Sequence, residues 1–169
     1  EQDARVSKAL MKDERILRAF ELTKRLYAFN KDHPKLEKLK EIFAEEFRKN
    51  PDTKAIVFSH FRDSSQRIAI DLKEFGAVRF VGQASKGRDI GLNQKQQAKI
   101  LQDFRDGKHN ILVCTSVGEE GLDIPSVDMV VFYEPVPSEI RKIQREGRTG
   151  RRRAGKVFIL ITKGTRDES

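Results

Sequence analysis

Short apolar runs alternate with amphipathic stretches from Asn50 onward, and this alternation limits the fold more than any other feature of the sequence. Uninterrupted apolar runs are typical of strands that are buried on both faces, as in a parallel sheet. The runs predict strands at residues 55–59, 78–81, 110–115, 129–133 and 156–162. Because the stretches between the runs have helical spacing, we expect an α/β fold with a doubly wound parallel sheet.

The helices between these strands have recognisable start signals. Side-chain oxygens of Ser, Asp and Asn cap helices because they accept the first backbone N–H groups, which have no partner inside the helix. The expected starts are Asp63 or Ser64, Asn93 with Gln96 as a capping box, and Pro137 with Ser138. Gly147 is the expected end of the last of these helices.

The first 48 residues have a different pattern, with apolar residues at helical spacing among charges and no strand-like run. Val6, Leu10 and Leu17 belong to a first helix, and Leu39 and Phe43 to a second. A break is expected between Asn30 and Pro34. The domain should therefore carry an N-terminal helical extension.

The chain is basic, with 34 Lys and Arg against 26 Asp and Glu and a formal net charge of +8. A basic balance favours an anionic partner such as nucleic acid, a nucleotide or an acidic protein. A solvated surface rich in lysine and glutamate would have the same composition. Charge alone leaves both interpretations open.

The composition also bears on the compartment. No apolar run is long enough to span a bilayer and no leader pattern is visible, so we expect no membrane partner. The single cysteine, Cys114, cannot form an internal disulfide, which fits a reducing, cytoplasmic compartment. The three histidines lack metal-ligand spacing, so we expect no metal site. A chain that starts at Glu1 and ends in GTRDES is expected to be part of a longer protein.

Ligands of doubly wound sheets bind beyond the carboxyl ends of the strands, so the loops there are the first candidates for a site. The loop after the third strand, TSVGEEGLDIP, begins with the hydroxyls of Thr115 and Ser116, which can donate to a backbone phosphate. Gly121 permits a close approach to a ligand, and Asp123 can accept a ribose hydroxyl. The same residues are compatible with an ordinary strand-to-helix turn. The loop alone therefore does not distinguish a ligand-binding site from such a turn.

The first strand ends in Ser59, His60, Phe61 and Arg62, which are able to hold a sugar-phosphate backbone. The alternative is that Ser59 and Asp63 cap the next helix and that Phe61 belongs to the core. A Ser-His nucleophile is not supported, because adjacent strand residues point to opposite faces and no acid completes a triad.

The segment QREGRTGR, residues 144–151, follows the expected helix that begins at Pro137. Gln144 lies one helical turn before Arg148, and Arg148 and Arg151 stand among glycines, where their planar guanidinium groups can converge on one phosphate. This arrangement suits an arginine finger, which stabilises the charge that develops in phosphoryl transfer. A non-specific basic stripe is the alternative interpretation. The sequence contains no GxxxxGK phosphate loop, so another domain is expected to bind most of the nucleotide.

These segments resemble conserved helicase motifs in their expected order. IVFSHFRDS resembles motif IV, ILVCTSVGEEGLD resembles motif V, and IQREGRTGR resembles motif VI of superfamily 2 helicases. The resemblance covers the chain from about His33 to Thr165 and is to the second RecA-like domain of those enzymes. Within superfamily 2, the segments TSVGEEGLD, FYEPVPS and GTRDE, together with the GQAS loop, are most similar in sequence to the group of archaeal Hef helicases and Fanconi-anaemia M-type translocases.

The resemblance implies roles for individual residues. Residues implied to act on ATP are the finger arginines Arg148 and Arg151, the phosphate sensor Gln144, and the nucleotide-facing Gly121 and Asp123. Residues implied to contact nucleic acid are Ser59, His60, Arg62, Gln83, Thr115 and Ser116. ATP and Mg²⁺ would be held mainly by the first RecA-like domain, which this sequence lacks. Residues 1–30 would be the tail of a helical inserted domain, and residues 31–169 the helicase C-terminal RecA-like domain.

The resemblance implies an ATP-dependent DNA helicase or translocase that acts on forked or branched DNA in repair or in the restart of stalled replication forks. The expected partners are DNA, the first RecA-like domain of the same polypeptide, and a nuclease domain further downstream. The expected location is the cytoplasm, with the nucleoid of an archaeon, or the nucleus of a eukaryote. The isolated chain should be inactive as an ATPase and as a nuclease.

Two other functions remain open. RNA-directed helicases of the innate-sensor and Dicer type have a similar motif V and an inserted helical region. A binding module without catalytic activity could use the same basic face for nucleic acid or protein. The intact motif VI speaks against a module, because binding alone does not need Gly147 and Gly150 next to the arginines.

Overall fold

A computed structural model of the chain describes residues 11–29, 32–83, 90–115, 126–135 and 155–168. The chain divides into two compact units, Glu1–Glu37 and Lys38–Ser169. Within the described ranges, no helix is both long enough and apolar enough to cross a membrane.

The first unit contains helix α2 (Glu14–Ala28), which confirms part of the expected helical extension. Asp13 caps the helix, because its carboxylate accepts the backbone N–H of Arg15 at 2.9 Å. None of the residues of α2 is buried, and Phe20 and Leu26 are among its exposed apolar side chains. Val6 and Leu10 lie outside the described residues, as does Asn30 at the expected break.

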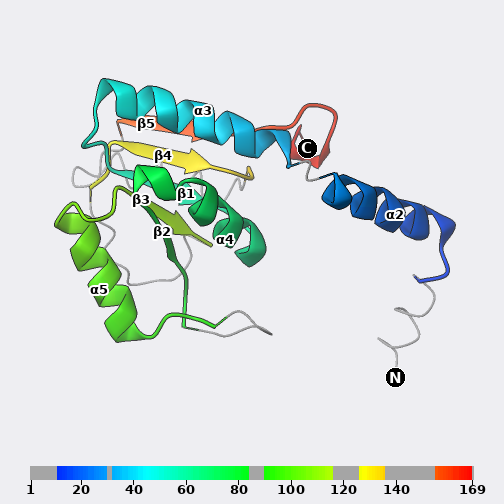
Figure 1. Ribbon diagram of the computed structural model, residues 1–169, viewed down its shortest axis with the longest axis horizontal. Coiled ribbons are helices and arrows are strands. Elements are labelled where there is room, and N and C mark those ends of the chain that lie inside the picture. The colour runs from blue at the N-terminus through cyan, green and yellow to red at the C-terminus, as the bar shows by residue number, and fades with distance from the viewer. Residues whose placement is uncertain (1–10, 30–31, 84–89, 116–125, 136–154, 169) are drawn as a thin grey trace. The chain divides into compact units, whose positions relative to one another are not determined.

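The second unit is built on a five-stranded parallel sheet (Figure 1), which confirms the predicted α/β fold. The spatial order is β2-β3-β1-β4-β5. The strands are β1 (Ala55–Phe58), β2 (Ala77–Phe80), β3 (Ile111–Cys114), β4 (Met129–Phe132) and β5 (Lys156–Ile159). All four residues of β1, β3 and β4 are buried, as the apolar runs predict for central strands.

Four of the observed strands are shorter than predicted, and β2 keeps the predicted length but begins and ends one residue earlier. The last predicted residues belong to loops that leave the sheet. At the end of β5, the backbone N–H of Thr162 donates to the Asp167 carboxylate at 2.9 Å instead of extending the ladder. Asp167 lies in a short 3₁₀ turn, η2 (Arg166–Glu168).

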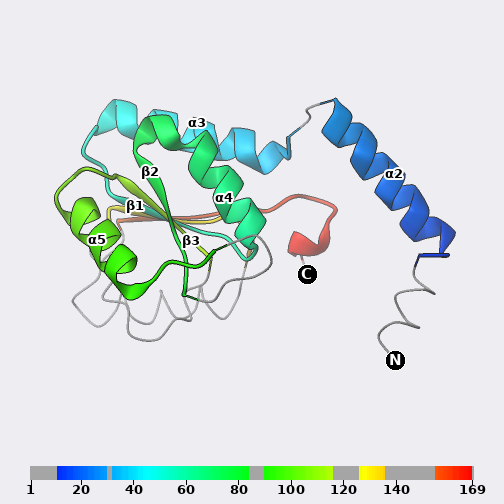
Figure 2. The same cartoon turned by 60° about the horizontal axis from the view of Figure 1, so that its bottom comes forward.

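Helices cover both faces of the sheet (Figure 2). One face is covered by α3 (Pro34–Lys49) and α4 (Arg62–Asp71), which is followed by the 3₁₀ turn η1 (Lys73–Phe75). The ring of Phe43 in α3 lies 6.4 Å from that of Phe75, and Arg79 of β2 donates to Ser65 of α4 at 3.0 Å. The other face packs against α5 (Gln94–Arg105).

The core between the sheet and α5 consists of alternate residues of the strands. The strand residues on this face are in register with one another, so they form continuous rows across the sheet. Their buried members, with those of α5 and the segment before β4, are Ile56, Phe58, Phe80, Leu101, Phe104, Leu112, Cys114, Val127, Val130 and Phe132. Burial of side chains of this size stabilises the fold by about 1.5–3 kcal/mol each.

The helix starts agree with the sequence at α5 but not at α4. Asn93 and Gln96 form the predicted capping box, with both hydrogen bonds at 2.9 Å. Helix α4 begins at Arg62, so the prediction of a cap at Asp63 or Ser64 is wrong. Phe61 occupies the N-cap position and makes no side-chain hydrogen bond there. The expected helix that starts at Pro137 lies outside the described residues.

Lys54 connects the start of β1 to the end of α5. Its ammonium group donates to the carbonyl oxygens of Phe104 at 2.9 Å and His109 at 2.8 Å. Burial lowers the pKa of Lys54, because the charged form loses contact with water. This contact satisfies a carbonyl group at the C-terminal end of α5, where cations are favourable.

Candidate functional site

The carboxyl ends of the five strands lie at one edge of the sheet, because all the strands are parallel (Figure 1). The chain leaves β1 toward β2, on one side of it, and leaves β4 toward β5, on the other side. The ends of β1 and β4 therefore form the topological switch point, where doubly wound sheets bind their ligands. The residues there are Ser59 and His60 after β1, and Tyr133 and Glu134 after β4.

Glu134 joins the ends of these two strands. One oxygen of its carboxylate accepts the backbone N–H of His60 at 2.9 Å, and the other lies 3.5 Å from the Ser59 hydroxyl. Ser59 is buried, with 3% of its surface exposed, and its hydroxyl also donates to the carbonyl oxygen of Phe61 at 3.3 Å. His60 is exposed. The Glu134 carboxylate therefore holds the backbone after β1 in place, and the His60 imidazole faces solvent.

Arg62 is the first residue of α4 and is half-buried. Its carbonyl oxygen accepts the Ser65 hydroxyl at 2.7 Å and the Arg79 guanidinium at 3.3 Å. Arg79 also donates to the Ser65 hydroxyl at 3.0 Å, so a side chain of β2 holds the first turn of α4. These bonds set the direction in which α4 leaves the carboxyl edge.

Gln83 is exposed just beyond the end of β2. Gly91 lies against its backbone so closely that a Cβ atom at position 91 would overlap the carbonyl group of Gln83. The backbone N–H of Leu92 donates to the carbonyl oxygen of Gly82 at 3.1 Å. The two ends of the GQAS loop are thus held together, and only glycine fits at position 91.

Thr115 is half-buried at the end of β3. This end lies beside the end of β1, because the backbone N–H of Ser59 donates to the carbonyl oxygen of Cys114 at 2.9 Å. The structure therefore brings Ser59, His60, Gln83 and Thr115 to the same edge. The other predicted residues lie outside the described part of the chain: Ser116, Gly121, Asp123, Gln144, Arg148 and Arg151. Their roles stay predictions.

Sequence reasoning missed two residues of this edge. Glu134 was not predicted, although a carboxylate directly after a buried strand is a signal for a residue at the ligand-binding edge. Phe61 was left between core and surface, and the structure exposes 59% of it. An aromatic residue after an apolar strand carries no sequence signal that separates these two outcomes.

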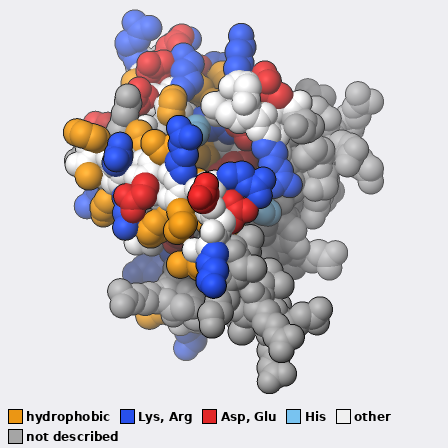
Figure 3. Space-filling model, turned by 90° about the vertical axis from the view of Figure 1, so that its right-hand side faces the viewer, with side chains coloured by type: hydrophobic (Ala, Val, Ile, Leu, Met, Phe, Trp, Pro, Cys, Tyr) orange, Lys and Arg blue, Asp and Glu red, His pale blue; other side chains and the backbone are white. Residues whose placement is uncertain are grey.

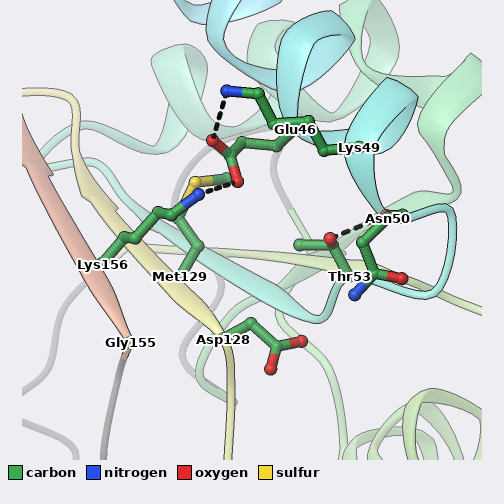
Figure 4. Close-up of a pocket in the computed structure, with 8 residues that line it drawn as sticks. All are labelled: Glu46, Lys49, Asn50, Thr53, Asp128, Met129, Gly155 and Lys156. Atoms are coloured by element: carbon green, nitrogen blue, oxygen red, sulfur yellow. Dashed lines mark hydrogen bonds and ion pairs between the residues drawn. The ribbon is translucent and has the colours of Figure 1, made fainter.

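A pocket of about 280 Å³ lies at the opposite edge, near the amino ends of β4 and β5 (Figure 4). Lys49 and Lys156 both pair with the Glu46 carboxylate there. The Asp128 carboxylate accepts the backbone N–H of Lys54 at 2.8 Å. The charges of the pocket are paired within the protein, and the pocket is remote from the switch point.

Basic, acidic and hydrophobic side chains are mixed among the described residues in Figure 3. The described part of the surface in Figure 3 is therefore not uniformly basic, although the chain has a net charge of +8. Within the described ranges, no group of three or more His, Cys, Asp or Glu side chains could hold a metal ion. Among the polar residues of the carboxyl edge, His60 and Gln83 are exposed, Arg62 and Thr115 are half-buried, and the Ser59 hydroxyl is buried within the protein.

An open parallel sheet of this order, covered by helices on both faces, defines a RecA-like α/β domain. The family model of the helicase conserved C-terminal domain matches residues 34–153. The chain belongs to this helicase family, which confirms the resemblance seen in the motifs.

Several relatives support this assignment. The crystal structure of the Hef helicase domain of Pyrococcus furiosus is 51% identical with a TM-score of 0.75, and the match covers 96% of this chain and 33% of that one. A protein of Methanocaldococcus jannaschii named as an ATP-dependent RNA helicase is 43% identical, over 99% of this chain and 21% of its own length. The ATP-dependent DNA helicase mph1 of Neurospora crassa is 46% identical, over 80% of this chain and 12% of its own length. The chain thus spans a third or less of each of these proteins.

Proposed function

We propose that this chain is the C-terminal RecA-like half of an ATP-dependent DNA helicase or translocase that acts on forked or branched DNA in repair or fork restart. The observation that carries the proposal is the 51% identity to the Hef helicase domain, over 96% of the chain. The carboxyl edge supports it, because Ser59, His60 and Thr115 meet near the switch point of the sheet.

In this proposal the domain contributes to two interfaces. Ser59, His60, Arg62, Gln83, Thr115 and Ser116 contact the DNA backbone. Arg148 and Arg151 reach the γ-phosphate of ATP, Gln144 senses that phosphate, and Gly121 and Asp123 face the nucleotide. ATP and Mg²⁺ are held mainly by the first RecA-like domain of the same polypeptide. Closure of the two domains over ATP would bring the arginines into place, and opening would shift the DNA contacts along the strand.

The domain organisation and the compartment belong to the same proposal. Residues 1–30 are the tail of a helical inserted domain, and residues 31–169 form the helicase domain. A nuclease domain further along the polypeptide is compatible with the similarity to Hef. The protein works where chromosomal DNA lies, which is the nucleoid in an archaeon and the nucleus in a eukaryote.

One observation favours a second candidate, an RNA-directed helicase. The relative from Methanocaldococcus jannaschii is named as an RNA helicase, whereas the mph1 relatives are named as DNA helicases. We favour DNA because several mph1 relatives are named as DNA helicases. Their sequence identity to this chain is about the same as that of the relative named as an RNA helicase.

The arginine finger is tested by Arg151→Ala in the protein that contains both RecA-like domains. An arginine finger contributes about 10³–10⁵-fold to turnover, so DNA-stimulated ATPase activity should fall by about three orders of magnitude. DNA affinity should change by less than about threefold, because in this proposal Arg151 contacts ATP and not the phosphates of the DNA. Both are measured by steady-state ATPase kinetics and by fluorescence anisotropy of labelled DNA.

Arg153→Ala is the matched control, because Arg153 belongs to the same basic run but lies outside the QREGRTGR segment. It should retain most of the ATPase activity. Equal, modest losses in both variants would contradict the finger and favour a basic stripe. A protein with both domains and no ATPase activity would favour the binding module.

A further inference from the structure

Phe61 is an unusual residue for its position, which is the start of α4 beside the switch point of the sheet. It occupies the N-cap of α4, where Ser, Thr, Asp and Asn are preferred because their side chains accept a backbone N–H. Phe61 makes no such bond, and 59% of its surface is exposed. It therefore contributes neither a cap nor a fully buried side chain. Departures from local preference of this kind are expected at functional positions.

The backbone of Phe61 is held firmly. Its carbonyl oxygen accepts the Ser59 hydroxyl at 3.3 Å and the backbone N–H of Ser65 at 2.9 Å. The residue on each side is held as well, because His60 donates to Glu134 and the carbonyl oxygen of Arg62 accepts from Arg79. The ring is therefore attached to a backbone that is already ordered, so little backbone freedom is lost when a ligand binds.

The rings of His60 and Phe61 pack against each other. The two ring centres are 4.8 Å apart and the ring planes meet at 84°, an edge-to-face pair. His60 is exposed as well. The pair leaves aromatic surface open to solvent, directly after the central strand of the sheet.

Exposed hydrophobic residues are common, so exposure alone identifies nothing. Ile70, in the last turn of the same helix, is also 59% exposed. Phe61 differs from Ile70 in three respects: it is aromatic, it stands at the switch point, and hydrogen bonds to Glu134 after β4 and within the first turn of α4 fix the segment around it. Ile70 thus provides an internal comparison on the same element.

We propose that Phe61, supported by His60, forms a stacking platform for one base of single-stranded DNA. The inference rests on the proposed function, in which the same segment holds the sugar-phosphate backbone. Every base has a π-face, so a platform of this kind binds without sequence preference and adds to the phosphate contacts. The domain then holds the strand by a base as well as by its charge.

The test uses the 169-residue chain, which contains no tryptophan. Phe61→Trp places a single fluorescent ring at the platform, and Ile70→Trp places one at the comparison position. Oligothymidylate should quench the fluorescence of Phe61→Trp and leave that of Ile70→Trp unchanged. An oligomer of equal length with abasic residues in place of thymidines should bind without quenching.

Affinities measured by anisotropy complete the test. Loss of a base–aromatic stack should weaken binding by about tenfold for Phe61→Ala, whereas Phe61→Tyr and Ile70→Ala should bind like the original chain. The original chain should bind the abasic oligomer about tenfold more weakly than oligothymidylate, and Phe61→Ala should no longer distinguish the two.

The outcomes separate this inference from the function on which it rests. Salt-sensitive binding of both oligomers with equal affinity, and no quenching of Phe61→Trp, would overturn the platform but keep the phosphate contacts. The absence of any binding to either oligomer would overturn the nucleic-acid face and the platform with it.

Discussion

Glu134 shows how a single residue shapes the candidate site. A carboxylate is an unexpected neighbour for the DNA backbone that we propose to bind at this edge, because like charges repel. Its position is explained by the backbone N–H of His60, which needs an acceptor at the end of β1, and by the Ser59 hydroxyl beside it. We infer that Glu134 is a positioning residue that holds the segment of residues 59–62 in shape.

Glu134→Ala should weaken binding of single-stranded DNA by about tenfold, since the segment loses its anchor, and should lower the free energy of unfolding by about 1 kcal/mol. Glu134→Gln keeps an acceptor for the His60 N–H and removes the negative charge, so its binding should equal or exceed that of the original chain. Anisotropy and urea unfolding measure the two effects.

Glu74→Ala serves as the control, because Glu74 is exposed in η1, which precedes the amino end of β2. If Glu134→Ala and Glu134→Gln both bind more tightly than the original chain, the carboxylate acts only by repulsion. The positioning role would then be wrong.

The residues of the site could be predicted from sequence only where their own chemistry marks them. Ser59, His60 and Arg62 are polar residues after an apolar run, and the structure places all three at the carboxyl edge. Glu134 and Phe61 depend on partners far along the chain or on exposure. The bond from His60 to Glu134 joins residues 74 positions apart, and no local pattern encodes it.

The elements were predicted as far as local interactions determine them. The four-residue strands follow the apolar runs, and the start of α5 follows a capping box between residues three positions apart. The start of α4 was predicted wrongly because contacts from elsewhere decide it. Arg79 of β2 and the hydroxyl of Ser59 hold the first turn, so the helix begins before the residues that would cap it.

This difference between the two helices can be measured. Asn93→Ala should lower the free energy of unfolding by about 1 kcal/mol, because the capping box of α5 loses its side-chain acceptor. Ser64→Ala should change it by less than about 0.5 kcal/mol, because Ser64 lies inside α4 rather than at its cap. Urea unfolding followed by circular dichroism tests both, and an equal loss in the two variants would contradict the assigned helix starts.

The whole molecule could be classified from its sequence, but its sheet order could not. Alternating strand and helix patterns predict a parallel sheet, whereas the order β2-β3-β1-β4-β5 depends on pairings between distant segments. The nucleotide-facing half of the candidate site stays a prediction, because Arg148, Arg151 and their neighbours lie outside the described residues.

The choice between DNA and RNA belongs to the same scale, since it concerns the protein with both RecA-like domains. Forked DNA should stimulate its ATPase activity more than tenfold above the level without nucleic acid, and double-stranded RNA of the same length should do so much less. The rates are compared at equal salt concentration, because phosphate contacts make binding strongly dependent on salt. Stronger stimulation by RNA would replace the proposed function with the RNA-directed candidate.

The central position of β1 has a consequence for synthesis on the ribosome. Among the strands of this sheet, Ala55–Phe58 is made first, yet one of its neighbours, β4, follows about 74 residues later. At typical rates of translation this interval lasts roughly 4 to 15 seconds. During that time one edge of an apolar strand has no partner, so the nascent chain is exposed to aggregation until Met129–Phe132 arrives. We therefore expect chaperones that bind nascent chains to recognise the AIVF segment.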